Sequence, residues 1–272
     1  MVSSLKLHGI GPVPQFSAKF GERLNLVTGD NGLGKTFLLD ACWYALTRTW
    51  AGGDEHAFYP PPDAPASDTP PSIDYSIIGK NGKPSSNQST YQYREQKWTF
   101  KAARPPMPGL VIYARIDGGF SIWDPARNYW HDNNETTERP SAYHFSNAQV
   151  WNGLEAGEGG KKDYLCNGLI RDVDLWFAKK NGAISLLQKV LEELSSTENE
   201  KLKIGKSVRV RTRDVRDTPT LEMPYGVVPV SQIAAGMRRV LSLAYMLVWA
   251  WEEHKQAAST QKENPTDKIV LL

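Results

Sequence analysis

Cysteine is scarce in this chain, with two residues in 272, Cys42 and Cys166, and neither has a C-x-x-C partner. This spacing argues against a disulfide framework and against the usual cysteine-based zinc sites. Cys42 also falls in an apolar stretch, where a free thiol packs as a small hydrophobic group. We therefore expect two packed free thiols and a reducing, cytoplasmic setting.

Long apolar runs are absent as well. The most apolar run, residues 240–251, is interrupted by Ser242 and Tyr245. It is well short of the ~20 residues that a membrane span needs, so we predict a core helix there. Residues 1–10 carry no apolar core of the kind found in secretory signals. These features predict a protein without a membrane partner.

The chain lacks an excess of either charge and lacks the histidine patterns of metal sites. Lysine and arginine total 32 against 30 aspartates and glutamates, a net charge of +2, which makes no general case for a polyanionic partner. No G-x-S-x-G elbow is present, so hydrolysis of a substrate other than a nucleotide has no support. Metal-ligand spacing is missing among the five histidines, which are His8, His56, His131, His144 and His254.

What the chain does contain is one complete phosphate-binding pattern, G-x-x-x-x-G-K-T. Glycines in such a loop allow the turns by which backbone N–H groups wrap a polyphosphate, the lysine adds a positive charge, and the threonine hydroxyl ligates Mg²⁺. The pattern predicts that the chain binds a nucleotide. Its eight residues are Gly29, Asp30, Asn31, Gly32, Leu33, Gly34, Lys35 and Thr36.

The flanks of this loop have the order that the motif requires. Residues 24–28 are typical of a short strand, and residues 36–50 of a helix that ends before Gly52 and Gly53. This helix has almost no polar face, so we expect it to be buried, with its N-terminus directed at the phosphates.

The rest of the chain alternates between β-rich and helical patterns. We predict strands at 4–7 and 16–20, then a proline-dense surface loop at 59–72, for which a proline-binding partner is the alternative. Hairpins follow in the β-rich segments 73–78, 91–102 and 110–123. Further helices are predicted at 147–154, 166–179, 183–195 and 235–258, and extended segments at 208–213, 221–230 and 268–272.

Two motifs give the chain a family resemblance. The form G-x-N-G-x-G-K-T resembles the loop of ABC-class ATPases outside transporters, such as the SMC and RecF proteins, and residues 231–239 resemble a degenerate ABC signature. The resemblance implies an α/β fold, an ABC-ATPase-like P-loop fold with an antiparallel β lobe and a helical signature lobe. It implies a single domain, 1–272, that contains a P-loop core (1–58), a β-rich lobe (72–131), a helical and signature lobe (141–258) and the start of a Walker B strand (268–272).

The group that the chain resembles most is that of the bacterial OLD-like and Septu-like AAA ATPases of anti-phage defence. In that group the last strand runs into the Walker B pair Asp-Glu, and the given sequence ends before those acids. The glutamate of that pair usually positions the attacking water. We therefore expect these 272 residues to bind ATP but to turn it over very slowly, with no catalytic residue assigned.

The resemblance also implies a head-to-tail homo-oligomer in which the loop of one copy faces the signature helix of another. The signature residues that would act in trans are Ala234, Ala235, Gly236, Met237 and Arg238. Ala234 stands where the family commonly has a serine. Arg238 and Arg239 are interpreted either as γ-phosphate contacts or as solvated charges, and adjacent helical positions cannot both face one phosphate. Mg²⁺ would be held by Thr36 and by Gln149, for which a surface glutamine is the alternative.

Our leading hypothesis is an ATP-dependent sensor or scaffold of an anti-phage system that controls a nuclease or another toxic effector. One alternative is a RecF- or SMC-like DNA-binding repair ATPase, in which Arg209, Arg211 and Arg213 on one side of an extended segment grip phosphates. A solvated strand face explains the same residues. A second alternative is a nucleotide-binding assembly module that does not hydrolyse. Trp123 and Trp130 fit base stacking or, more simply, packing.

Overall fold

The computed structural model describes eight stretches of the chain, which are residues 1–61, 69–79, 82–100, 107–129, 140–156, 163–180, 182–195 and 201–272. Within them the chain forms two compact units. Unit 1 comprises Met1–Ile116, Ser121–His144 and Ala257–Leu272, and unit 2 comprises Asp117–Phe120 and Phe145–Gln256. The fold is α/β with antiparallel sheets and helices, as predicted. The finer division into lobes stays a prediction.

Unit 1 contains a five-stranded antiparallel sheet with the strand order β2-β1-β3-β4-β5. Apolar residues alternate along these strands, and Leu5, Leu7 and Ile73 face the core. The sequence thus builds a sheet with one apolar and one polar face. Its strands are β1 (Val2–His8), β2 (Gln15–Lys19), β3 (Ser72–Ile78), β4 (Pro84–Gln92) and β5 (Lys97–Phe100).

A second sheet of four strands has the order β14-β6-β7-β8. Strand β14 lies parallel to β6, as we expected of residues 268–272, although Ile269 and Leu271 are half exposed instead of buried. The helix α2 (Pro125–Asn128) follows β7, and a 3₁₀ turn, η1 (Asp54–His56), follows α1. The four strands are β6 (Leu110–Ala114), β7 (Phe120–Trp123), β8 (Tyr143–Phe145) and β14 (Ile269–Leu271).

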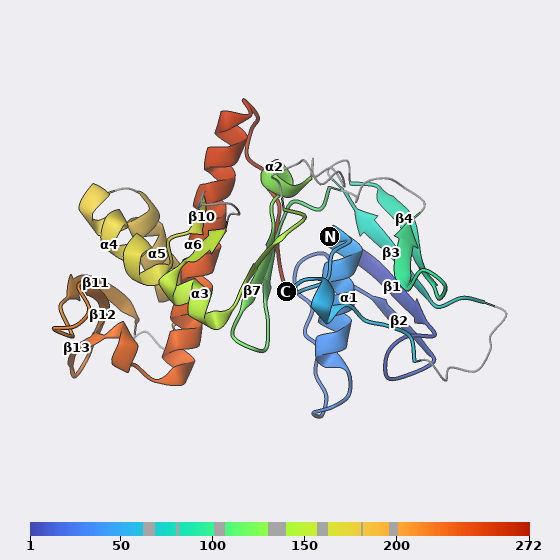
Figure 1. Cartoon of the computed structure of the whole chain (residues 1–272), viewed down its shortest axis with the longest axis horizontal. Helices are drawn as coiled ribbons and strands as arrows, with labels where there is room; N and C mark the ends of the chain where they lie inside the picture. Colours follow the sequence, from blue (N-terminus) through green and yellow to red (C-terminus); the bar gives the residue numbers. More distant parts are fainter. Residues whose placement is uncertain are drawn as a thin grey trace. The chain divides into compact units, whose positions relative to one another are not determined.

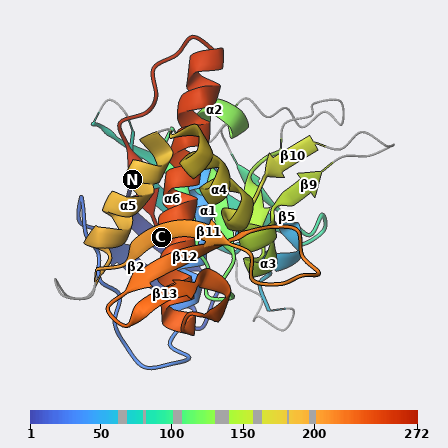
Figure 2. The same ribbon diagram turned by 90° about the vertical axis from the view of Figure 1, so that its left-hand side faces the viewer.

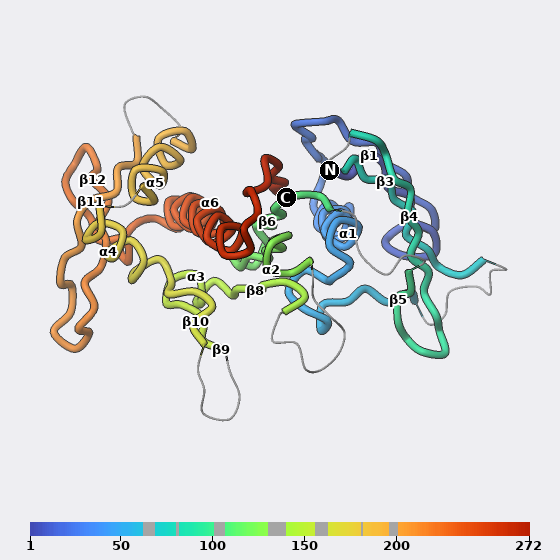
Figure 3. Tube along the Cα trace, turned by 90° about the horizontal axis from the view of Figure 1, so that it is seen from above, coloured from blue at the N-terminus to red at the C-terminus, as the bar shows by residue number. Residues whose placement is uncertain are grey.

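The helix α1 (Lys35–Thr47) lies between the two sheets and contacts β1, β3 and β6 (Figure 3). Residues 41–47 are all buried, which confirms the predicted buried helix. It ends three residues earlier than predicted because Arg48 adopts a left-handed conformation (φ 59°) that closes the last turn. Arg48 is held there by stacking over Phe100 at 4.8 Å.

Unit 2 is mostly helical and includes a small sheet (Figure 2). The helices α4 and α5 pack on this sheet, which has the order β11-β12-β13. A helix is present in each of the predicted segments 147–154, 166–179, 183–195 and 235–258, but two bounds are wrong. The first helix ends at Asn152, before β9, and the second begins at Leu169, because Cys166 belongs to β10. The elements are α3 (Asn147–Asn152), β9 (Leu154–Ala156), β10 (Asp163–Cys166), α4 (Leu169–Lys179), α5 (Gly182–Glu193), β11 (Lys203–Val208), β12 (Thr218–Met223), β13 (Gly226–Pro229), η3 (Val230–Gln232) and α6 (Ala235–Thr260) (Figure 1).

The predicted strand at residues 24–28 is wrong. Leu24 and Leu26 are 87% and 84% exposed, and the segment pairs with no described strand. The side chain of Asn25 instead bonds both backbone groups of Gly21, accepting from its N–H (2.7 Å) and donating to its carbonyl (3.1 Å). Such local bonds from asparagine compete with strand pairing.

Three other extended segments also differ from prediction. Residues 91–102 contain a turn at 93–96, which ends β4 and begins β5. Residues 221–230 form a hairpin, β12 to β13, that turns at Pro224 and Tyr225. Residues 209–213 are not a strand, because β11 ends at Val208. In the first two cases a turn divides the predicted strand into two paired strands, and in the third the strand ends before the arginines.

Candidate functional site

The phosphate-loop residues lie at the N-terminus of α1, on the surface of unit 1 (Figure 1). Gly29, Gly32 and Gly34 have φ angles of 143°, 85° and 81°, which residues with a Cβ rarely adopt. Gly34 is also the residue before the helix, and a Cβ there would lie 2.9 Å from the ring of Pro12. The glycines therefore serve backbone geometry, as expected for a loop that wraps a ligand with N–H groups.

Lys35 is the first residue of α1, and its ammonium group folds back over the loop. It donates to the carbonyl oxygens of Gly29 at 2.7 Å and Asp30 at 2.6 Å. A bound phosphate would present charged oxygens to this ammonium group, and these accept stronger hydrogen bonds than neutral carbonyls do. Thr36 follows in the first helical turn, where the backbone N–H groups have no intrahelical acceptor.

A cavity of about 270 Å³ lies beside the loop, and the sequence analysis did not predict it. Its lining is mainly apolar and includes Ile10, Val13, Phe16, Val27, Leu33 and Phe37. These residues come from the β1–β2 loop, β2, the segment before the phosphate loop, the loop itself and α1. No single sequence motif links them, so only the fold shows that they meet.

The predicted signature residues lie at the start of α6 in unit 2. Ala234, Ala235, Gly236 and Arg238 are exposed, and Met237 is half-buried. A Cβ on Gly236 would have no neighbour within 4 Å, so the helix end is open.

The two adjacent arginines of this helix have separate surroundings. The guanidinium of Arg238 donates to the carbonyl of Ser231, and that of Arg239 lies 5.0 Å from the ring centroid of Phe120. Burial lowers the pKa of Arg239, while nearby Asp117 raises it. The two side chains point in different directions, as helical geometry requires.

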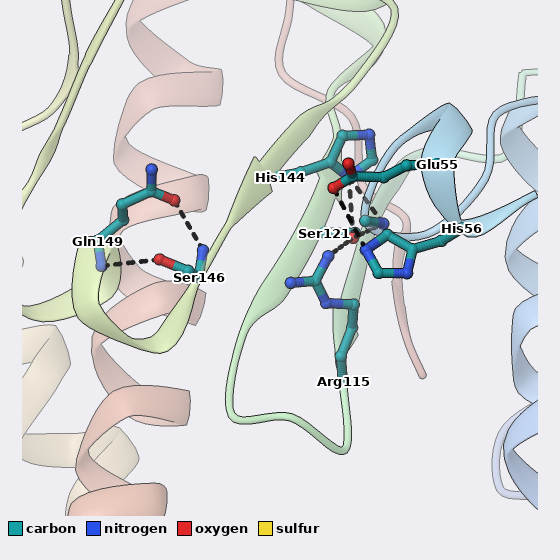
Figure 4. Close-up of polar contacts among 8 residues, drawn as sticks. Glu55, His56, Arg115, Ser121, His144, Ser146 and Gln149 are labelled. Carbon is teal, nitrogen blue, oxygen red and sulfur yellow. Dashed lines mark hydrogen bonds and ion pairs between the residues drawn. The ribbon is translucent and has the colours of Figure 1, made fainter.

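Gln149 lies on α3 in unit 2, where it forms a capping box with Ser146. The side-chain oxygen of Gln149 accepts from the backbone N–H of Ser146 at 2.8 Å. The backbone N–H of Gln149 donates to the Ser146 hydroxyl at 3.3 Å (Figure 4). One lone pair of the amide oxygen is thus already used. The assignment of Gln149 to Mg²⁺ stays a prediction.

A polar cluster that the sequence analysis missed lies near α1 in unit 1 (Figure 4). His144 Nδ1 lies 3.0 Å from the hydroxyl of Ser121 and accepts from the N–H of Gly52 at 3.2 Å. Burial, together with the smaller effects of the nearby Arg115 and His56, lowers the pKa of His144 to about 4. The imidazole is therefore neutral at pH 7, with Nδ1 as an acceptor.

This neutral histidine makes stability depend on pH. Because the pKa of His144 is lower in the folded chain, the unfolded chain binds the proton more tightly. The contribution of His144 to the free energy of unfolding is therefore fully present above pH 6.5 and is lost as the pH falls toward 4. We expect a loss on the order of 3 kcal/mol over this window, measured by urea unfolding of the purified chain. His144→Gln keeps an acceptor but not the titration, so its profile should be flatter. An equal slope in both proteins would contradict this origin.

The described residues contain no group of three or more His, Cys, Asp or Glu side chains that could hold a metal ion. Cys42 and Cys166 are buried free thiols, as predicted, and burial raises their pKa to about 12 and about 11. Trp123 is also buried (1% exposed), which favours packing over base stacking, while Trp130 and His131 fall outside the described residues. Among the described helices, none is both long and apolar enough to cross a membrane.

The basic segment that follows β11 is partly neutralised. Arg209 pairs with Asp217 at 2.6 Å, and Arg216 pairs with Asp214 at 3.0 Å. These bonds fold the segment into a loop, so the predicted row of three arginines along one side of a strand is wrong. Arg211 and Arg213 remain exposed on this loop.

Comparison with known proteins adds a family match. A family model described as "AAA domain" matches residues 4–206. No curated protein matches the chain. Two solved structures are similar to it at 11% identity and a TM-score of 0.41, both of the recombination mediator protein RecF in the RecFOR pathway. The RecF-ATPrS structure aligns with 100% of this chain and 84% of its own, and the RecF-ATP structure with 97% and 83%.

Proposed function

We propose that this chain, which belongs to the AAA domain family, binds ATP with Mg²⁺ and works as a nucleotide-gated switch. One observation supports this most: three glycines at positive φ lead into a buried helix whose first residue, Lys35, folds over the loop. This is the arrangement that a polyphosphate needs, with N–H donors around it and one flexible cation above it.

The residues of the loop would divide the work among them. Backbone N–H groups from Gly32 to Thr36 hold the phosphates, helped by the positive end of the α1 dipole. Lys35 leaves its two carbonyl acceptors and moves to the phosphate oxygens. The Thr36 hydroxyl holds Mg²⁺, which when bound neutralises charge on the phosphates. Gly32 has open space where a Cβ would be, so the loop has room for a ligand.

The switch itself would be association with a second copy. The N-terminus of α6, residues 234–238, would reach the γ-phosphate bound by the other copy, since its first N–H groups have no intrahelical acceptor. Ala234 offers no hydroxyl there, so the backbone and Arg238 would carry the contact. A head-to-tail pair of this kind would bury two nucleotides, and its association would depend on the γ-phosphate.

This association is testable with matched glycine variants. Gly236 and Gly182 both lie in helices with open space around them, so glutamate fits at either position in the isolated chain. We expect the wild type to dimerise with Mg²⁺ and a non-hydrolysable ATP analogue in sedimentation velocity, and Gly182→Glu to behave alike. Gly236→Glu should bind the analogue but stay monomeric, because its carboxylate repels the γ-phosphate. Dimerisation of Gly236→Glu at wild-type concentrations would overturn the proposed contact.

We further propose that the switch serves as a sensor or scaffold in a bacterial anti-phage system and controls a nuclease or toxic effector. The support for this role is the sequence resemblance to OLD-like and Septu-like ATPases. Deletion of the gene from its host should then raise phage plating efficiency, and a Lys35→Ala allele should not restore protection.

A second candidate, a DNA-binding repair ATPase, is favoured by one observation: Arg211 and Arg213 are exposed and form no ion pair with a described carboxylate. If they contact duplex phosphates, Arg211→Glu with Arg213→Glu should reduce affinity for a 30-bp DNA at least tenfold at 50 mM salt and flatten the salt dependence. Lys206→Ala serves as the control. Equal binding by both proteins would remove this candidate.

A further inference from the structure

We propose that the outer edge of β2 is a docking site for an extended segment of a partner protein, in which apolar residues alternate with acidic ones. Such a segment would add a sixth strand to the five-stranded sheet. The proposal goes beyond nucleotide binding, because it concerns the strand edge of β2, although the cavity on its inner side is lined in part by Leu33, Gly34 and Lys35 of the phosphate loop. Three features of this edge support it: free backbone groups, an apolar cavity on the inner face, and a polar outer face with Lys19 at the edge.

The backbone groups of β2 alternate in direction, and the bonds at its two ends fix which of them are free. Gly9 N–H donates to Pro14 and Phe20 N–H donates to Ser3, so hydrogen-bonded positions recur at every second residue between these ends. Phe16 and Ala18 therefore bond β1. The backbone groups of Gln15, Ser17 and Lys19 point outward, and no described residue bonds them. They offer a new strand three N–H donors and three acceptors.

The inner face of β2 borders the apolar cavity beside the phosphate loop. Phe16 is opposite the core residue Leu7 in β1, so its side chain lies on the inner face, and it is 37% exposed. Val13, at the same end of the sheet, is 43% exposed. Both line the cavity of about 270 Å³, together with Leu33 and Phe37. An added strand would place every second side chain on this inner face, where apolar groups are favoured.

The outer face is a polar groove of about 890 Å³ that crosses four strands. Register places Ser17 opposite Lys6 and Lys19 opposite Ser4. Neither Lys6 nor Lys19 pairs with a described carboxylate. The one carboxylate of the groove, Asp74, already accepts from Ser72 (3.0 Å) and Gln88 (2.7 Å). Lys6 also lies opposite Asp74 in β3, so the two offset each other within the groove. The positive charge with no carboxylate opposite it is that of Lys19, at the C-terminal end of the β2 edge.

Together these faces define the occupant. Inner positions require apolar side chains, and outer positions are complemented by Asp or Glu beside Lys19. Since β2 has five residues, the bound segment would be five or six residues long. A nucleic acid offers no backbone donors to pair with a strand edge. Two β2 edges paired antiparallel about Ser17 would place Lys19 opposite Gln15, which gives the lysine no acidic partner.

The probe is a fluorescein-labelled peptide, Ser-Val-Glu-Ile-Glu-Val-Glu-Ser, titrated with the full chain and followed by anisotropy. Controls are the same peptide with lysine for each glutamate, and one with its apolar residues consecutive. The wild type should prefer the glutamate peptide at least tenfold over both. Ser17→Pro removes an outward N–H while leaving the β1 bonds, and Ser17→Ala is its matched control. Proline should abolish binding and alanine should not.

Charge reversal and an inner-face variant complete the test. Lys6→Glu with Lys19→Glu should reverse the preference toward the lysine peptide, and Val13→Asp should weaken binding tenfold or more, even if Ser17→Pro does not fold. Binding by Ser17→Pro equal to that by Ser17→Ala would overturn the edge as the site. Failure of the wild type to bind the glutamate peptide would overturn the proposal. So would a wild-type dimer that Ser17→Pro converts to a monomer, because the edge would then pair two copies of the chain.

Discussion

Lys35→Ala is expected to lower the affinity of the chain for ATP by at least 100-fold. The ammonium is the only side-chain cation that belongs to the phosphate loop, and its present acceptors, the carbonyls of Gly29 and Asp30, show that it reaches across the loop. Charge-assisted bonds to phosphate contribute about 1.5–3 kcal/mol each, so the loss of two such bonds is a loss of several kcal/mol. The measurement is fluorescence titration with a labelled ATP analogue and Mg²⁺.

The matched control for Lys35→Ala is Lys206→Ala, which removes an exposed lysine of unit 2. It should bind nucleotide like the wild type. Unfolding curves of both variants should match that of the wild type, because the Lys35 ammonium is bonded only to exposed loop carbonyls. If Lys35→Ala still binds with an affinity within a few-fold of the wild type, the loop is not the phosphate site.

Trp43→Ala is expected to destabilise unit 1 by about 3–5 kcal/mol, the range for truncating a fully buried aromatic side chain. Trp43 has no exposed surface, packs against Tyr113 and His144 with ring centroids 6.3 Å away, and donates to the Thr49 hydroxyl at 3.2 Å. It thus fixes α1 against the second sheet. The change should be seen in urea unfolding, and it should weaken nucleotide binding only through loss of folded chain.

A control for Trp43→Ala is Ile116→Ala, because Ile116 is an apolar residue of unit 1 that is 85% exposed. Its unfolding free energy should stay within about 0.5 kcal/mol of the wild type. A shift for Trp43→Ala no larger than that of Ile116→Ala would show that α1 is not held by this side chain.

The sequence predicted what depends on local pattern. The phosphate loop and α1 follow from eight contiguous residues and the apolar helix after them. The helix α6 begins at Ala235, as predicted from a helical pattern that runs over residues 235–258. The strands that were predicted wrongly would each have needed a neighbouring strand to pair with, which a local sequence pattern does not reveal. Residues 24–28 have strand-like composition, yet Asn25 bonds Gly21 and no described strand lies alongside.

In the candidate site, too, local patterns were predictable and contacts between distant segments were not. Gly34 and Lys35 could be assigned from spacing, whereas the cavity that includes Phe16 and Phe37 requires knowledge of which strand folds over which helix. The bonds between His144, Ser121 and Gly52 span up to 92 positions in sequence, and no motif links them. The predicted basic row that included Arg209 is wrong because Arg209 pairs with Asp217, eight residues away across a loop.

The central claim is that the chain binds nucleotide triphosphate at the loop of residues 29–36. It is tested most directly by calorimetric titration of the wild-type chain with a non-hydrolysable ATP analogue in the presence of Mg²⁺. We expect saturable binding with one site per chain, weakened when Mg²⁺ is withdrawn. Absence of saturable heat at millimolar analogue, with a chain that unfolds cooperatively, would contradict the account.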